Sequence, residues 1–256
     1  RWTHSYVLPA CIFTHCVISI EDDIMGGPEN EMEVKYINHM GSDLSVVNAA
    51  RVSFGKRSVE ECYDQIDVDG YQLTIPHINS KDRGLLRYLA LHEHWTPFAH
   101  TALTYYIKAP IFVARQLGKH QVGLVWNEVS RRYVDYTPEL YSPDEWRLAS
   151  KDKKQGSSDE TTEYSVQPAH VFALQCYQNM IETGIAPEQA RMVLPQSAYT
   201  EWYWTGSLSA FHRVYAQRIA EDAQKETRYV AQQIGEVCAK LFPVSWRNLI
   251  ETGEYL

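Results

Sequence analysis

The order in which strand-like and helix-like segments follow one another most constrains the fold of this chain. Residues 102–108 (ALTYYIK) combine β-branched and aromatic side chains and predict a strand, and Pro110 suits the first turn of a helix that follows it. Residues 199–205 (YTEWYWT) predict a second strand, whereas residues 170–184 (HVFALQCYQNMIETG) predict a helix between the two. The segments mix without the regular βαβ pattern of a parallel sheet, so the sequence indicates an α+β fold.

Two further helices are marked by their boundaries. Residues 80–89 predict a helix with Ser80 and Asp82 at its start and leucines on one face. Pro187 opens a shorter helix, and Pro195 closes it.

A helix beginning after Ser207 carries the most informative charge. Ser207 suits an N-cap, and Phe211 and Tyr215 share an apolar face at helical spacing. The same spacing places Arg218 and Asp222 on that face. An arginine that continues an apolar stripe must meet an anion or return to water. Arg218 is therefore a candidate functional residue, with an ordinary i,i+4 ion pair to Asp222 as the structural alternative.

The chain divides into a short appendage and one domain. Regular patterning begins at Met32, so we expect residues 1–31 to be an N-terminal appendage to a domain spanning residues 32–256. The apolar stretch at residues 7–20 is too short for a membrane span and lacks the flanks of a signal peptide, and we expect neither. The polar run from Lys151 to Thr162 (KDKKQGSSDETT) predicts a surface loop.

Charge and cysteine content exclude several classes of protein. A formal net charge of −8 argues against an extended nucleic-acid interface, which needs a basic face. The five cysteines are odd in number and form no C-x-x-C pair, which favours a reduced chain in the cytoplasm over a disulfide framework. They are Cys11, Cys16, Cys62, Cys176 and Cys238.

Polar side chains are densest in residues 115–133 (RQLGKHQVGLVWNEVSRRY). This segment carries four cations and a single carboxylate, Glu128, within a chain that is acidic overall. Arginine forks and an ammonium match phosphate oxygens, and neutral amide and hydroxyl groups suit the edge of a planar heterocycle. On spacing alone, the solvated charged face of a helix is an equally good interpretation.

The same segment resembles the flavin-dependent thymidylate synthase family. Residues 127–133 (NEVSRRY) fit the family ending N-E-x-S-x-R-Y, and five other segments match in unchanged order across about residues 36–250. These segments are V-V-N-A-A-R-V-S-F (46–54), H-E-H-W-T-P-F-x-H (92–100), A-P-I-F-V-A-R-Q (109–116), A-R-M-V-L-P (190–195) and R-x4-A-Q-x-E (218–226). The chain departs from the family at its R-H-R element, where it reads Lys119-His120-Gln121, with one extra residue before Asn127.

The resemblance implies a fold, a reaction and an assembly. It implies a single α+β domain in which helices flank a central, mostly antiparallel sheet. It implies reductive methylation of dUMP to dTMP, with 5,10-methylenetetrahydrofolate as carbon donor and FAD, reduced by NADPH, as hydride source. It further implies a homotetramer with shared active sites, and neither nucleic acid nor a membrane as partner.

Roles for individual residues follow from the same resemblance. Arg218 matches the arginine that lies against the pyrimidine and favours its ionised form. The positions expected to bind dUMP are Gln116, Lys119, Glu128, Ser130, Arg131, Arg132 and Arg191. The positions expected to contact FAD are Ser53, His94, Thr96, Lys119, His120, Gln121, Asn127, Glu128 and Arg213.

Other functions remain open at this point. The altered R-H-R element leaves room for a related enzyme that finishes with a hydroxymethyl group or uses another pyrimidine, and for a nucleotide- or flavin-binding protein without turnover. A cysteine-dependent synthase would need an activated thiolate, and no cysteine lies in a Pro-Cys-His setting. His92, His94 and His100 have zinc-like spacing, but no cysteine or H-E-x-x-H completes a site, so we expect no metal.

Overall fold

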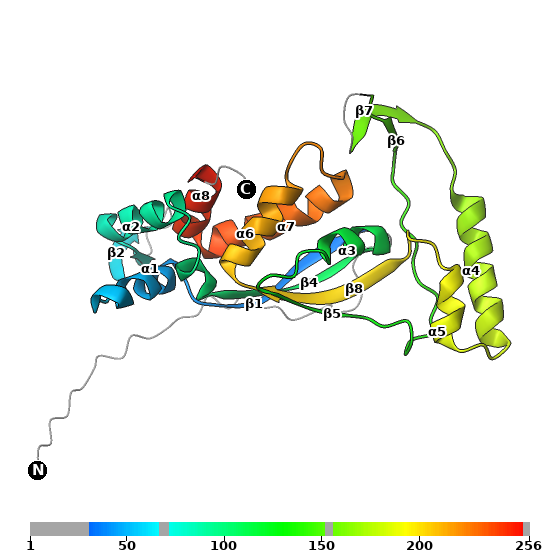
Figure 1. Cartoon of the computed structure of the whole chain (residues 1–256), viewed down its shortest axis with the longest axis horizontal. Helices are drawn as coiled ribbons and strands as arrows, with labels where there is room; N and C mark the ends of the chain where they lie inside the picture. Colours follow the sequence, from blue (N-terminus) through cyan, green and yellow to red (C-terminus); the bar gives the residue numbers. More distant parts are fainter. Residues whose placement is uncertain (1–30, 67–71, 152–155, 253–256) are drawn as a thin grey trace, which may run out of the picture.

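The computed structural model describes residues 31–66, 72–151 and 156–252 (Figure 1). The strands are β1 (Glu33–Met40), β2 (Glu61–Ile66), β3 (Gln72–His77), β4 (Ala102–Pro110), β5 (Leu124–Glu128), β6 (Trp146–Ala149), β7 (Ser157–Thr162) and β8 (Tyr199–Gly206). The helices are α1 (Asp43–Arg51), α2 (Ser80–Leu91), α3 (Ile111–Leu117), α4 (Gln167–Glu182), α5 (Pro187–Ala190), α6 (Leu208–Arg218), α7 (Lys225–Leu241) and α8 (Pro243–Thr252). Short 3-10 turns follow α1 (Val52–Phe54), precede β4 (Pro97–Ala99) and follow α5 (Arg191–Val193).

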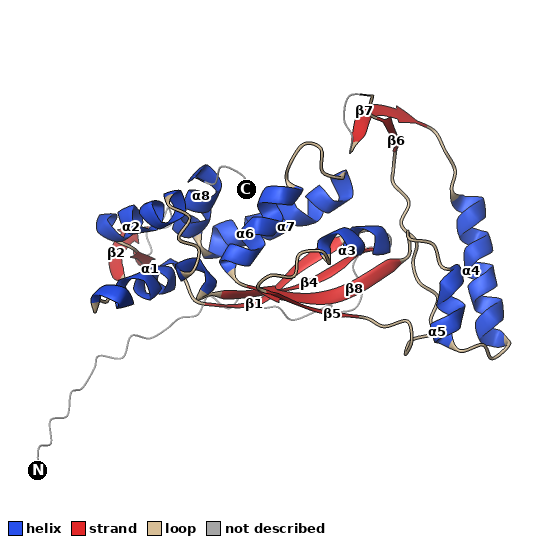
Figure 2. Ribbon diagram, in the orientation of Figure 1, coloured by secondary structure: helices blue, strands red, loops and turns tan. Residues whose placement is uncertain are grey.

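A four-stranded antiparallel sheet forms the centre of the fold. Its strand order is β1-β4-β8-β5, and each neighbouring pair is antiparallel. Helices α3, α6 and α7 lie over one face of this sheet (Figure 2). The predicted α+β class with a mostly antiparallel sheet flanked by helices is therefore confirmed.

Alternation along β4 explains which face is covered. Leu103, Tyr105 and Ile107 are fully buried, whereas the residues between them are partly exposed. Successive side chains in a strand point to opposite faces, so this pattern places one face of β4 in the core beneath the helices. On β8, Trp202 and Trp204 are buried in the same way. Burying an aliphatic or aromatic side chain of this size contributes about 1.5–3 kcal/mol, so these rows fix the register of the sheet.

A buried carboxylate joins the first and last helices. Asp43, at the start of α1, accepts hydrogen bonds from the backbone N–H groups of Val244 (2.9 Å) and Ser245 (2.8 Å) at the start of α8. The first N–H groups of a helix have no partner within it, and a carboxylate there also meets the positive end of the helix dipole. Asp43 thus caps a helix about 200 residues away in sequence.

Most predicted elements coincide with observed ones. The two predicted strands are β4 and β8, and the predicted helix ending at Gly184 is α4. Ser207 is the N-cap of α6, where its side chain accepts from the backbone of Ala210.

Two predictions about local structure are wrong. The polar run from Lys151 to Thr162 is not wholly a loop, because residues 157–162 form β7 and pair with β6 as a hairpin. Most of its side chains face solvent, which explains their polarity, while the backbone still pairs with β6. Asp222 does not share a helical face with Arg218, because α6 ends at Arg218 and α7 begins at Lys225.

Residues 1–30 lie outside the described part, so the expected boundary between residues 31 and 32 stays a prediction. Within the described residues, no helix is both long enough and apolar enough to cross a lipid bilayer.

Candidate active site

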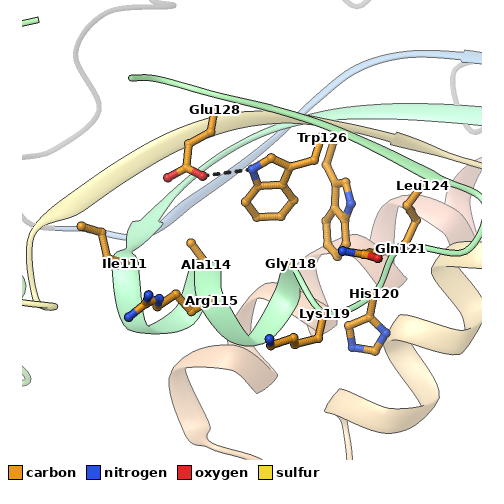
Figure 3. Close-up of a pocket in the computed structure, with 11 residues that line it drawn as sticks. Ile111, Ala114, Arg115, Gly118, Lys119, His120, Gln121, Leu124, Trp126 and Glu128 are labelled. Carbon is orange, nitrogen blue, oxygen red and sulfur yellow. Dashed lines mark hydrogen bonds between the residues drawn. The ribbon is translucent and has the colours of Figure 1, made fainter. Parts of the chain in front are cut away.

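The predicted polar segment does not form one helix but folds around a cavity. It begins in α3, turns at residues 118–123 and continues as β5. These parts and Trp204 of β8 enclose a cavity of about 430 Å³ (Figure 3). Its lining includes Arg115, Lys119, His120, Gln121, Trp126 and Glu128. The interpretation of residues 115–133 as a charged helix face is therefore wrong. Two of the four cations, Arg115 and Lys119, share a concave surface with Glu128.

Arg218 reaches this cavity wall from the last turn of α6. Its Nε donates to Nε2 of His120 (2.9 Å), and its Nη2 donates to the backbone carbonyl of Gln116 (3.3 Å). An arginine N–H can only donate, so Nε2 of His120 must accept and its proton must lie on Nδ1. The described contacts of Arg218 do not include the alternative ion pair with Asp222, which lies beyond the end of α6.

The electrostatic environment keeps His120 neutral. Burial, followed by the positive charges of Arg218 and Arg213, lowers the pKa of His120 to about 4. Burial also lowers the pKa of Arg218. An arginine nevertheless remains protonated at neutral pH, because its ordinary pKa is above 12. The pair therefore presents a guanidinium and a neutral imidazole side by side.

Glu128 is held in one orientation. Its Oε1 accepts from the Thr200 hydroxyl (2.6 Å), and its Oε2 accepts from the indole N–H of Trp126 (3.1 Å). The Trp126 ring stacks on Trp202 with centroids 4.3 Å apart and meets Trp204 edge-on at 5.5 Å. The indole N–H of Trp204 is buried without a hydrogen-bond partner in the described structure. A planar ligand in this cavity would meet the aromatic walls formed by Trp126 and Trp204.

The turn after α3 is anchored by α6. Arg213 Nη2 donates to the backbone carbonyl of Val122 (2.7 Å). Gly123 has a φ of 75°, and a Cβ there would lie 3.3 Å from Ala210 of α6. The turn therefore approaches α6 closely at a residue without a side chain. Arg213 thus holds the segment that carries Lys119, His120 and Gln121, and its predicted contact with FAD stays a prediction.

A second cluster of predicted residues lies near α5. The Arg132 guanidinium is 3.5 Å from the Glu188 carboxylate, and Arg191 Nε donates to the Glu188 backbone carbonyl (3.2 Å). The Ser130 hydroxyl accepts from the backbone N–H of Arg132 (3.3 Å). The Arg132 side chain is 53% exposed, so this pair of arginines is accessible to an anion.

Arg131 points elsewhere. It donates to the Tyr136 backbone carbonyl and lies over the Tyr136 ring at 4.4 Å. Asn127 alternates with Trp126 and Glu128 along β5 and so faces the opposite side of the sheet from the cavity. Within one chain, neither residue joins the cavity.

A third cluster lies at the other end of the sheet. Ser53, His94 and Thr96 line a cavity of about 820 Å³ formed by α1, α2 and the turns that follow them. Glu93, two residues after the end of α2, has a positive φ of 54°. The chain changes direction there, immediately before His94. Phe54 and Trp95 on its rim are 77% and 57% exposed. This cavity shares no lining residue with the one around His120.

Sequence reasoning missed the residues that orient the predicted ones. Thr200 and Trp126 fix Glu128, and Gln224 and Thr227 bond to the side chain of Gln116. Trp126 is only two residues from Glu128, on the same face of β5. The other three residues lie about 70 to 110 residues from their partners, so no local spacing signals them. Among the described residues, no group of three or more His, Cys, Asp or Glu side chains is arranged to hold a metal ion.

Comparison with known proteins gives consistent matches. The sequence model of the family described as thymidylate synthase complementing protein matches residues 35–244. The flavin-dependent thymidylate synthase of Thermus thermophilus is 35% identical over 219 residues, which are 83% of this chain and 73% of that protein. The Kosmotoga olearia protein of the same name is 33% identical, over 87% of this chain and 93% of that one.

A solved structure agrees with these sequence matches. A UMP/dUMP methylase from Streptomyces cacaoi, solved with 5-Br dUMP, superposes with a TM-score of 0.71 at 30% identity. The superposition covers 88% of this chain and 97% of that one.

Proposed function

We propose that this chain methylates dUMP to dTMP, because it belongs to the family of thymidylate synthase complementing proteins. The members of this family are the flavin-dependent thymidylate synthases. The carbon would come from 5,10-methylenetetrahydrofolate. Bound FAD, recharged by NADPH, would supply the hydride that completes the methyl group.

One observation carries this proposal: the Arg218 guanidinium projects from α6 onto the turn of residues 118–123, beside a neutral His120. A fixed cation favours negative charge on the uracil ring, which activates C5 as a carbon nucleophile. The Nδ1–H of His120 would then be a donor toward a ligand carbonyl. No side chain needs to attack the ring.

The phosphate and the flavin would be bound by separate clusters. Arg132 and Arg191 are suited to the dianionic 5′-phosphate, which one arginine alone neutralises poorly. The two cavities fit the planar rings of a flavin in volume and lining, since ligand pockets usually measure about 300–1,000 Å³. Lys119 supplies one charge in place of the missing arginines but without their planar fork.

The separation of the clusters supports a shared site. Ser53, His94 and Thr96 line one cavity, whereas Lys119, His120 and Gln121 line another. A flavin that contacts both sets would therefore lie between chains, and we propose a homotetramer in the cytoplasm. Light scattering that finds an active monomer would contradict this assembly.

Anaerobic incubation with FAD, NADPH, dUMP and methylenetetrahydrofolate, followed by mass analysis of the nucleotide, tests the activity. We expect the nucleotide to gain one CH₂. A hydroxymethyl product would identify a related enzyme, and flavin binding without any product would identify a non-catalytic protein. Because the superposing structure is named a UMP/dUMP methylase, UMP is a second candidate substrate and belongs in the same assay.

A further inference from the structure

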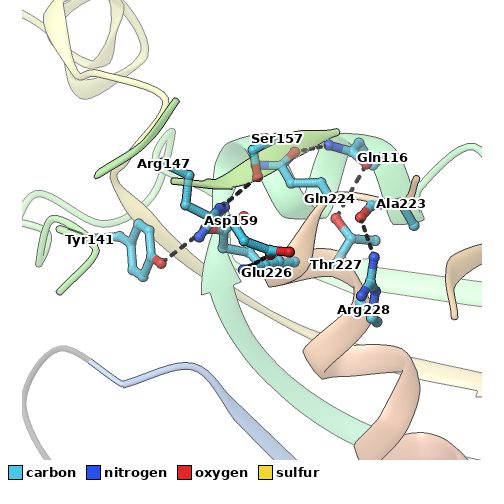
Figure 4. A network of polar contacts seen from close by, with 11 residues as sticks. Gln116, Tyr141, Arg147, Ser157, Asp159, Ala223, Gln224, Glu226, Thr227 and Arg228 are labelled. Atoms are coloured by element: carbon cyan, nitrogen blue, oxygen red, sulfur yellow. Dashed lines mark hydrogen bonds and ion pairs between the residues drawn. The ribbon is translucent and has the colours of Figure 1, made fainter. Parts of the chain in front are cut away.

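The β6–β7 hairpin lies against the connection between α6 and α7 (Figures 1 and 4). A Cβ at Gly156 would be 3.1 Å from the backbone oxygen of Asp222, so the two backbones are in close contact. The connection begins at Arg218 and ends at Gln224, the N-cap of α7. The hairpin is thus in a position to influence the candidate site from outside the cavity.

A buried ion pair joins the hairpin to α7. Arg147 of β6 donates through Nη2 to Glu226 Oε1 (2.7 Å) and through Nε to the Ser157 hydroxyl of β7 (2.8 Å). The side chains of Arg147 and Glu226 are only 20% and 6% exposed. Burial alone would raise the pKa of Glu226, but its hydrogen bonds, first the one from Arg147, and the Arg147 charge together hold it below its usual value. Glu226 is therefore ionised, with Arg147 as its charged partner and the Tyr141 hydroxyl as a further donor (3.3 Å).

The first turn of α7 then holds the side chain of Gln116. Gln116 donates through its amide nitrogen to Gln224, and its amide oxygen accepts from the Thr227 hydroxyl at 3.3 Å (Figure 4). The amide nitrogen and the amide oxygen of Gln116 each have a hydrogen-bond partner, so the orientation of the amide is fixed. The direction of its second N–H is fixed with it. The backbone carbonyl of the same residue accepts from Arg218.

We propose that Arg147 is a positioning residue for nucleotide binding: through Glu226 and the first turn of α7, it fixes the amide of Gln116. This inference rests on the proposed function and on the expectation, implied by the family resemblance, that Gln116 contacts dUMP. Arg147 does not line the cavity around His120; with Gln224 and Glu226 it lines a separate cavity of about 340 Å³. For a nucleotide bound beside His120 and Arg218, its effect therefore passes through Gln116.

Dissociation constants for dUMP, measured by calorimetry without turnover, test the proposal. Arg147→Gln should weaken dUMP binding about three- to tenfold, which corresponds to one hydrogen bond lost or misdirected. Arg147→Lys should recover part of this loss, because it keeps the charge beside Glu226. Lys225→Ala is the matched control, since Lys225 joins the same hairpin to α7 through an exposed pair with Asp159 (3.2 Å). This control should leave dUMP affinity unchanged.

A double-substitution cycle separates positioning from general stability. In a Gln116→Ala background, Arg147→Gln should have no further effect on dUMP affinity. Additive losses, or equal losses in the Lys225→Ala control, would overturn the proposal. Failure of the unsubstituted chain to bind dUMP at all would instead remove the proposed function, and this inference with it.

Discussion

Replacing Arg218 with methionine should raise the pKa of His120. Burial is the largest cause of its low value of about 4, and the Arg218 cation, whose Nε lies 2.9 Å from Nε2, is the next. Two unit charges at 4 Å interact by about 1 kcal/mol in water and about 4 kcal/mol at an effective dielectric constant of 20. His120 is partly exposed, so we take about 1.4 kcal/mol, which predicts a rise of about one pH unit.

The sign of the accompanying stability change follows from the same pKa. The folded chain holds His120 neutral down to a pH of about 4, whereas an unfolded histidine binds its proton near pH 6.5. The unfolded state therefore binds more protons in this window, and the free energy of unfolding should fall as the pH drops from about 6.5 to 4. Arg218→Met should make this part of the decrease smaller.

Nitrogen-15 NMR of labelled histidine provides the assay. Titration gives the pKa of His120, and the two ring nitrogen shifts show which nitrogen carries the proton. We expect an Nδ1–H tautomer in the unsubstituted chain, and a smaller rise of the pKa in Arg213→Met, whose guanidinium is already engaged by Val122. A proton on Nε2, or a pKa that Arg218→Met leaves unchanged, would refute the reasoning.

Three other substitutions have defined outcomes. Arg218→Ala should retain FAD, seen as flavin absorption, yet lose most dTMP formation; normal turnover would remove Arg218 from its catalytic role. Lys119→Arg should tighten FAD by restoring a planar fork, and an unchanged flavin dissociation constant would count against that account. Asp43→Ala should lower the free energy of unfolding by about 2 kcal/mol and the melting temperature by roughly 4–8 °C, because two N–H groups of α8 lose their acceptor. Thermal denaturation followed by circular dichroism checks it, and an unchanged melting temperature would show that this cap is dispensable.

The strands and helices with a strong local pattern could be predicted from the sequence. Buried and more exposed side chains alternate along residues 102–107 and 201–206, because one face of each strand packs in the core. Strands β4 and β8 were therefore predictable. The Ser207 cap was predictable for a similar reason, because a serine side chain satisfies a local backbone donor. Such features depend on neighbours only a few residues away.

Features that depend on distant partners could not be predicted. Strand β7 is polar throughout (SSDETT), and Arg147 of β6 pairs with Glu226, 79 residues away. The end of α6 at Arg218 was missed because the apolar spacing continues beyond it, while the side chain of Arg218 turns toward His120. The hydrogen bond from Arg213 to the backbone carbonyl of Val122, 91 residues away, likewise has no local signal in the sequence.

The fixed orientation of Glu128 limits what can lie beside it. An anionic carboxylate accepts hydrogen bonds only, and next to an imide edge it discourages loss of the imide proton. The guanidinium of Arg218 has the opposite effect on acidity. If both groups faced the same heterocycle, their effects on the acidity of its imide proton would cancel. In a site that uses both, Glu128 and Arg218 must therefore contact different molecules or different edges of one ring. Glu128, held by hydrogen bonds from Trp126 and Thr200, is suited to accept from a sugar hydroxyl or from the imide of a ring that keeps its proton. The pyrimidine that becomes more acidic would then contact Arg218.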